Sequence, residues 1–98
     1  MLKLFGEQDG GFISFPIKGY TLALDFPIRN GLFEFLDRLD EMVLAHGGRI
    51  YLTKDARMSK EMFWKSYPLA KQFQSTVKKF SPNFKWRSAQ SDRLEITK

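Results

Sequence analysis

The fold is decided by residues 30–48, which read NGLFEFLDRLDEMVLAHGG. Asn30 is a residue type that commonly caps the start of a helix, and Gly47-Gly48 can adopt the left-handed backbone at which helices often end. Between these limits the pattern predicts one amphipathic helix. The apolar positions that follow helical spacing are Leu32, Leu36, Leu39 and Val43.

Two runs before this helix alternate as β-strands do. The first is predicted over residues 13–17 and the second over residues 20–26, with turn residues between them. One face of the second run carries only small or polar side chains, Thr21, Ala23 and Asp25, which leaves room for solvent or for a ligand. The two runs together predict a β-hairpin.

Residues after the helix predict a third strand and further helices. Residues 50–53 are apolar and β-prone, and Ser59 is placed to cap a helix that Tyr67-Pro68 interrupts. A helix over residues 69–80 follows, and a short last helix capped by Ser88 or Ser91 is favoured over a strand. The sequence thus predicts one α+β domain over residues 1–98, with a small, mainly antiparallel sheet and helices packed on one face.

The charge is divided unevenly between the two halves of the 98-residue chain. The net charge is +5, with about −3 in residues 1–48 and about +8 in residues 49–98. The second half therefore offers a surface for something anionic, such as nucleic acid, lipid headgroups or a phosphorylated substrate. A solvated basic face with no partner is the alternative.

Composition excludes several kinds of catalytic site. The chain has no cysteine, so no thiolate site can form, and with its one histidine, His46, in a helix-capping role no histidine is left for a triad or a metal cluster. No G-x-G-x-x-G or phosphate-binding loop is present. No apolar run approaches the length of a membrane span. His46 is expected to lie in the last turn of the helix predicted from residues 30–48 and to bond its exposed carbonyls.

Two stretches remain as candidates for binding or chemistry. Lys54 follows the predicted third strand, where it can hold an anion, pair with Asp55 or stay solvated. Residues 84–87 interleave Phe84 and Trp86 with basic side chains, as in platforms that stack single-stranded nucleic acid. Burial of these rings beneath charged neighbours is the alternative for the second stretch.

The chain resembles the C-terminal part of the vanillyl-alcohol-oxidase class of FAD-linked oxidases, which includes the aldonolactone oxidases. The resemblance covers nearly the whole chain from about Gly11, in order and with compatible spacing. Its pieces are Ser14-Phe15-Pro16, Gly19-Tyr20-Thr21, Leu24-Asp25-Phe26-Pro27-Ile28, Gly47-Gly48-Arg49-Ile50-Tyr51, Lys54-Asp55-Ala56-Arg57, Tyr67-Pro68 and Arg93-Leu94.

The resemblance implies a site and a cofactor. FAD would be bound mainly by a preceding N-terminal segment. Tyr51 and Lys54 match the active-site tyrosine and lysine of the family, and Thr21, Ala23 and Asp25 would face flavin and substrate. Thr21 and Ala23 stand where known members have asparagine and cysteine. No metal ligand is implied.

The resemblance also implies a function for the longer enzyme. It would oxidise a hydroxyl of a polyprenyl-phosphate-linked sugar or a related aldose or aldonolactone, in the cytoplasm, with peripheral membrane association. Residues 1–98 alone are expected to be inactive, and nucleic acid is not an expected partner. Two alternatives stay open: a standalone basic module for single-stranded nucleic acid, and a structural partner of a separate flavoprotein subunit.

Overall fold

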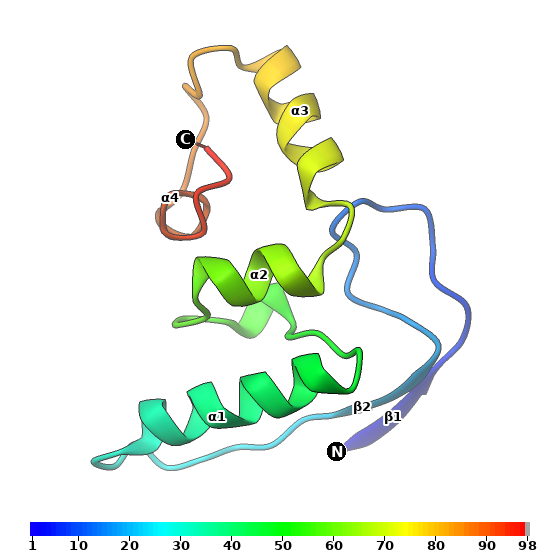
Figure 1. Cartoon of the computed structure of the whole chain (residues 1–98), viewed down its shortest axis with the longest axis vertical. Coiled ribbons are helices and arrows are strands. Elements are labelled where there is room, and N and C mark those ends of the chain that lie inside the picture. The colour runs from blue at the N-terminus through cyan, green and yellow to red at the C-terminus, as the bar shows by residue number, and fades with distance from the viewer. Residues whose placement is uncertain (98) are drawn as a thin grey trace.

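The computed structural model describes residues 1–97, which form an α+β fold (Figure 1). A two-stranded antiparallel sheet lies beside four helices and one short 3₁₀ turn in this part of the chain. The elements are β1 (Leu2–Phe5), β2 (Gly19–Leu22), α1 (Leu32–Ala45), η1 (Leu52–Lys54), α2 (Lys60–Ser66), α3 (Ala70–Phe80) and α4 (Ala89–Arg93). The predicted fold class is confirmed, although the sheet is smaller than the sequence indicated.

The hairpin pairs β2 with β1, and the predicted partner, residues 13–17, is wrong. The register runs from Leu2 opposite Leu22 to Phe5 opposite Gly19. Residues 13–17 are irregular instead. The carboxylate of Asp9 accepts hydrogen bonds from the amide of Gly11 and the hydroxyl of Ser14 at 2.8 and 2.9 Å. These bonds curl the chain just where the predicted strand would begin.

The strand predicted over residues 50–53 is also wrong, because this segment contains the 3₁₀ turn η1. Side chains from later in the chain occupy its backbone acceptors. The Tyr67 hydroxyl donates to the carbonyl of Ile50 at 2.6 Å, and the side-chain amide of Gln90 donates to the carbonyl of Leu52 at 2.8 Å. Carbonyls satisfied in this way do not need a neighbouring strand, and no strand–helix–strand crossover forms among residues 1–97.

Helix α1 confirms the helix predicted from residues 30–48. It begins after Gly31, whose φ of 84° is left-handed, and not at the predicted cap Asn30. At the other end, Nδ1 of His46 lies 2.7 Å from the carbonyl oxygen of Met42, which confirms the capping role expected for this histidine. Gly47 follows with a φ of 75°, as a helix-terminating glycine does.

The remaining helices also match their sequence signals. The Ser59 hydroxyl accepts from the amide of Met62, and the Ser88 hydroxyl accepts from the amide of Ser91. Tyr67-Pro68 separates α2 from α3 as predicted. The buried core gathers around α2, and its largest fully enclosed side chains are Tyr67, Phe63, Met58 and Leu94.

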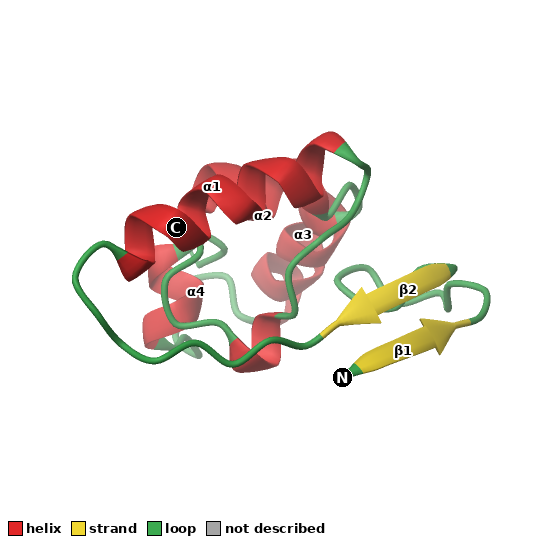
Figure 2. Cartoon of the chain, turned by 90° about the horizontal axis from the view of Figure 1, so that it is seen from below, coloured by secondary structure: helices red, strands yellow, loops and turns green. Residues whose placement is uncertain are grey.

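The molecule is open and flat for its size. Its radius of gyration is 14.5 Å, against about 13 Å for a compact chain of this length. The hairpin projects away from the helical part (Figure 2), so it adds surface and little core. None of the helices within residues 1–97 is both long and apolar enough to cross a membrane.

Candidate functional site

The candidate site is the segment 51–54, which we call the 51–54 turn. It consists of Tyr51 and the 3₁₀ residues Leu52–Lys54. Its backbone is held from two sides, by Tyr67 of the α2–α3 link through the carbonyl of Ile50 and by Gln90 of α4 through the carbonyl of Leu52. Residues distant in sequence therefore fix the course of the turn.

Asp55 holds the turn from a third side. Its side chain is only 3% exposed. One carboxylate oxygen accepts from the amides of Arg57 and Met58 at 3.1 and 2.7 Å, and the other accepts from the guanidinium of Arg93. The sequence alternative in which Lys54 pairs with Asp55 is therefore wrong, because Asp55 is already bonded to other groups.

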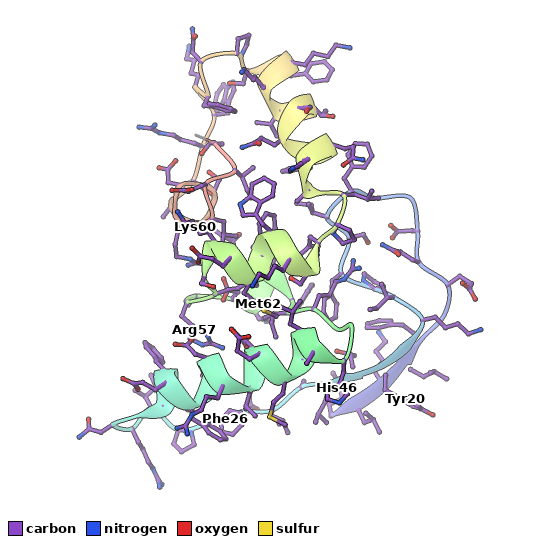
Figure 3. All side chains as sticks on the ribbon, in the orientation of Figure 1. Tyr20, Phe26, His46, Arg57, Lys60 and Met62 are labelled. Atoms are coloured by element: carbon purple, nitrogen blue, oxygen red, sulfur yellow. The ribbon has the colours of Figure 1, made fainter. Side chains whose placement is uncertain are left out.

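Arg57 ties the segment that follows the turn to α1 (Figure 3). Its two terminal nitrogens lie 2.9 and 3.0 Å from the two oxygens of Asp40, and one of them also lies 2.7 Å from Asp37. Burial acts to lower the pKa of Arg57, but bonding and attraction from Asp40, with Asp37 and Asp55 adding to it, raise the pKa overall. The guanidinium therefore stays charged, and the pair is a fixed link.

Tyr67 and Arg49 brace the other end of the turn. The guanidinium carbon of Arg49 lies 5.0 Å from the centre of the Tyr67 ring, and its Nη1 donates to the carbonyl of Ser14 at 2.9 Å. Burial raises the pKa of the Tyr67 hydroxyl to about 12. The hydroxyl therefore remains a proton donor to Ile50 across the physiological pH range.

The raised pKa of Tyr67 makes stability depend on alkaline pH. An unfolded tyrosine ionises near pH 10, whereas Tyr67 keeps its proton until about pH 12 when folded. Protonated Tyr67 therefore makes its full contribution to the free energy of unfolding below pH 10. That free energy should fall by about 2–3 kcal/mol as the pH rises from 10 to 12. Urea unfolding of the chain and of Tyr67→Phe over this range measures the effect, since the variant lacks the titrating group. The expectation is contradicted if the free energy of unfolding falls equally steeply with pH in the two proteins.

Tyr51 and Lys54 present their side chains outward from this braced turn. The Tyr51 ring is 44% exposed and lies 5.0 Å from the ring of Phe15, which in turn meets Phe5 of β1 edge-on at 6.0 Å. Lys54 is exposed, and among residues 1–97 its ammonium has no hydrogen-bond or ion-pair partner. The turn therefore offers one phenol and one unpaired positive charge.

The hairpin residues predicted to face a ligand are only partly brought to the same place. Thr21 is half-buried and lies on the hairpin face that also carries Phe5, so it shares a side with the ring contacts that lead to Tyr51. Ala23 lies just beyond β2, where its amide and carbonyl bond Met1 at 2.8 and 3.0 Å. Asp25 is exposed further along the extended segment.

The sequence reading missed the groups that brace the turn. A charged residue in an amphipathic helix is expected on the solvent side, but Asp40 is 6% exposed and bound to Arg57. The signal was present, because Asp40 lies four residues after Leu36, on the apolar side of the helix. Gln90 and Arg93 carry no local signal, since their partners lie 38 residues earlier in the chain.

The second candidate stretch, residues 84–87, presents one open ring. Trp86 is 78% exposed, whereas Phe84 is half-buried with a left-handed φ of 48°. Proteins that bind single-stranded nucleic acid stack successive bases on several exposed aromatic rings. With one such ring, the stretch gives weak support to the alternative of a nucleic-acid-binding module. Among residues 1–97 no three carboxylate or imidazole groups are gathered so that they could hold a metal ion.

Comparison with known proteins confirms the resemblance drawn from the sequence. Nearly the whole chain is similar to an oxidase of a lipid-linked sugar. That relative is the decaprenylphosphoryl-β-D-ribose oxidase of Mycolicibacterium smegmatis, which is 38% identical over 96 residues, or 98% of this chain. An uncharacterized protein in the mprA 5′ region of Streptomyces coelicolor is 39% identical over 97 residues. No model of a known protein family matches the chain.

The chain is much shorter than these relatives. It spans 21% of the length of the oxidase and 26% of the length of the Streptomyces protein. This proportion is consistent with the sequence reading, in which the chain corresponds to a C-terminal segment of a larger oxidase.

Proposed function

We propose that this chain is the substrate-side, C-terminal portion of an FAD-dependent oxidoreductase. The enzyme would oxidise a hydroxyl of a polyprenyl-phosphate-linked sugar, or of a related aldose or aldonolactone. The observation that carries the proposal is the 51–54 turn, in a chain 38% identical to a sugar oxidase. Tyr51 and Lys54 of this turn are exposed, and the contacts that brace the turn do not use their side chains.

Lys54 and Tyr51 have separable roles in this proposal. Oxidation of an alcohol removes a hydride from carbon, which the flavin would accept, and a proton from oxygen, which would pass to solvent water, and negative charge develops on the oxygen as the proton leaves. The unpaired ammonium of Lys54 would stabilise that charge. The phenol of Tyr51, oriented by its contact with Phe15, would hydrogen-bond the substrate and fix its position.

The described residues fit one edge of a flavin but not the whole dinucleotide. An exposed ammonium and phenol suit contact with a flavin ring and its substrate, whereas the chain has no glycine-rich cradle for the pyrophosphate. FAD would therefore be held mainly by an N-terminal segment, and it would supply the acceptor of the hydride. Thr21 lies on the hairpin face nearest the turn, and Ala23 and Asp25 would line the approach.

The basic second half suits the substrate class. Residues 49–98 carry a net charge of about +8, which would attract a phosphorylated molecule or an anionic headgroup layer. An enzyme whose substrate carries a polyprenyl chain must meet it at a membrane surface, so we propose a cytoplasmic protein with peripheral membrane association. No spanning helix is needed for that contact.

A segment exchange tests the proposed function. The part of the M. smegmatis oxidase that matches this chain is replaced by residues 1–98, and the chimeric protein is purified with its FAD. Adding decaprenylphosphoryl-β-D-ribose without oxygen is expected to bleach the flavin absorbance, because residues 1–98 would complete the substrate side. The isolated chain serves as the control and is expected to retain no flavin.

Two outcomes contradict this proposal. In the first, the chimera binds FAD and is folded, yet neither polyprenylphosphoryl sugars nor aldonolactones reduce the flavin, while the parent enzyme is reduced. In the second, the isolated chain itself purifies with stoichiometric flavin. The parent enzyme measured in parallel shows that substrate and conditions are sound.

A further inference from the structure

The outer face of the hairpin is apolar and uncovered. Cross-strand pairs lie on one side of a sheet, so the pairing of Leu2 with Leu22 and of Leu4 with Tyr20 places these four side chains on a common face. All four are between 61% and 73% exposed. The opposite face carries Phe5 and Thr21 and is turned toward the rest of the chain.

This apolar face continues into a groove beside α1. Leu22 belongs to both, because it also lines an open groove of about 540 Å³ between the segment after β2 and the helix. Phe26 lies along the helix in this groove (Figure 3) and packs edge-on against Phe35 at 5.8 Å. We call the hairpin face and groove together the hairpin–α1 surface; its members are Leu2, Leu4, Tyr20, Leu22, Leu24, Phe26, Leu36, Leu39, Met42 and Val43.

The total accessible surface is large for a chain of this mass. The chain exposes 7487 Å², whereas a compact monomer of this mass exposes about 5,800 Å². The excess of about 1,700 Å² is roughly twice the area that one protein contributes to a standard interface. A two-stranded hairpin is also marginal in water unless something packs on it. Both observations call for an extensive covering partner.

Charge distinguishes between kinds of partner. Within residues 1–97, the basic side chains nearest the hairpin–α1 surface are turned away from it or paired: Lys3 lies on the opposite hairpin face, and Arg57 in the groove is neutralised by Asp37 and Asp40. The half of the chain that forms this surface carries a net charge of about −3. Nucleic acid and anionic lipid both require a basic surface, so a polypeptide is the partner that fits.

We infer that the hairpin–α1 surface docks on the polypeptide that carries the flavin, which extends the sheet or covers its apolar face. The inference rests on the proposed function. This polypeptide is the expected occupant because nearly four-fifths of the relative's length lies outside the matched segment. The long unmatched chain supplies enough polypeptide to cover an excess area of this size.

Co-expression of two pieces tests the inference. Tagged residues 1–98 are produced together with the M. smegmatis oxidase from which the matching segment is deleted. The pieces are expected to co-purify in equal amounts. Leu4→Lys and Tyr20→Lys should each lower the yield of the complex roughly tenfold or more, because an apolar interface excludes an unpaired ammonium.

Phe80→Lys is the matched control. Phe80 is 79% exposed at the end of α3, outside the hairpin–α1 surface. Like Leu4→Lys and Tyr20→Lys, its replacement exchanges an exposed apolar side chain for a charged one, but it should leave the yield of the complex unchanged. Circular dichroism of each isolated variant checks that the fold survives. Because all three side chains are exposed, none of the substitutions should perturb it.

Hydrogen exchange in the single-chain chimera gives a second measurement that needs no assembly from pieces. The amides of β1, β2 and the extended segment after β2 are expected to exchange at least tenfold more slowly in the chimera than in the isolated chain. The inference is overturned if exchange there is unchanged, or if Leu4→Lys and Phe80→Lys affect co-purification alike. It is overturned equally if the isolated chain forms a dimer that Leu4→Lys dissociates, or binds anionic vesicles through this surface.

The outcomes separate this inference from the proposed function. A complex that forms through the hairpin–α1 surface but is not reduced by any sugar substrate leaves the docking inference standing and removes the proposed activity. A chimera whose flavin is reduced by the sugar, but whose hairpin amides exchange as fast as in the isolated chain, leaves the proposed activity standing and removes the docking inference.

Discussion

Replacing Lys54 by alanine in the chimeric oxidase is expected to slow flavin reduction by the sugar substrate by roughly two or more orders of magnitude. Lys54 carries the unpaired ammonium of the braced turn, so its loss removes a positive charge from the point where negative charge develops. FAD content and folding should stay nearly unchanged, because the side chain bonds nothing within residues 1–97. Stopped-flow absorbance under single-turnover conditions measures the rate.

Lys78→Ala is the control for this substitution. Lys78 lies on the exposed side of α3, so its removal deletes the same charge from a place that faces solvent. Its reduction rate should equal that of the unchanged chimera. Equal rates for the two variants would make Lys54 an ordinary surface lysine and would remove the site assignment.

The helical part of the fold could be predicted because its signals are local. The apolar spacing of α1, the Ser59 and Ser88 caps and the break at Tyr67-Pro68 each depend on residues within one or two turns. Capping and amphipathic spacing act within a segment, so a sequence displays them directly.

The sheet could not be predicted in the same way. Residues 13–17 alternate as well as β1 does, but Asp9 curls the chain before them. Residues 50–53 are β-prone, yet their carbonyls are taken by Tyr67 and Gln90. Strand formation depends on which backbone finds a neighbour, and that choice is made by residues far along the chain.

In the candidate site, too, the exposed residues could be predicted from the sequence, whereas the distant contacts that position them could not. Tyr51 and Lys54 could be singled out from the sequence, and their roles remain predictions. The groups that position them, Asp55 with Arg93 and Gln90 with Leu52, span 38 residues in each case. The resemblance motifs Lys54-Asp55-Ala56-Arg57 and Arg93-Leu94 are thus joined in space, although the sequence gives no indication of this contact.

The second large effect is expected at the pair of Arg57 and Asp40. Arg57→Ala should lower the free energy of unfolding by about 3–5 kcal/mol, because it leaves the buried carboxylate of Asp40 without its partner. For a chain of this size that is a large share of the total stability. Urea unfolding followed by circular dichroism measures the loss.

Two further variants show whether this loss comes from an orphaned charge. The double variant with Arg57→Leu and Asp40→Leu should recover most of the stability, because apolar side chains of similar volume can replace a buried ion pair at little cost. Lys60→Ala, which removes the half-exposed ion pair with Glu95, should cost less than about 1 kcal/mol. A double variant as unstable as Arg57→Ala would show that the two α1 contacts matter for packing and geometry rather than for compensation of charge.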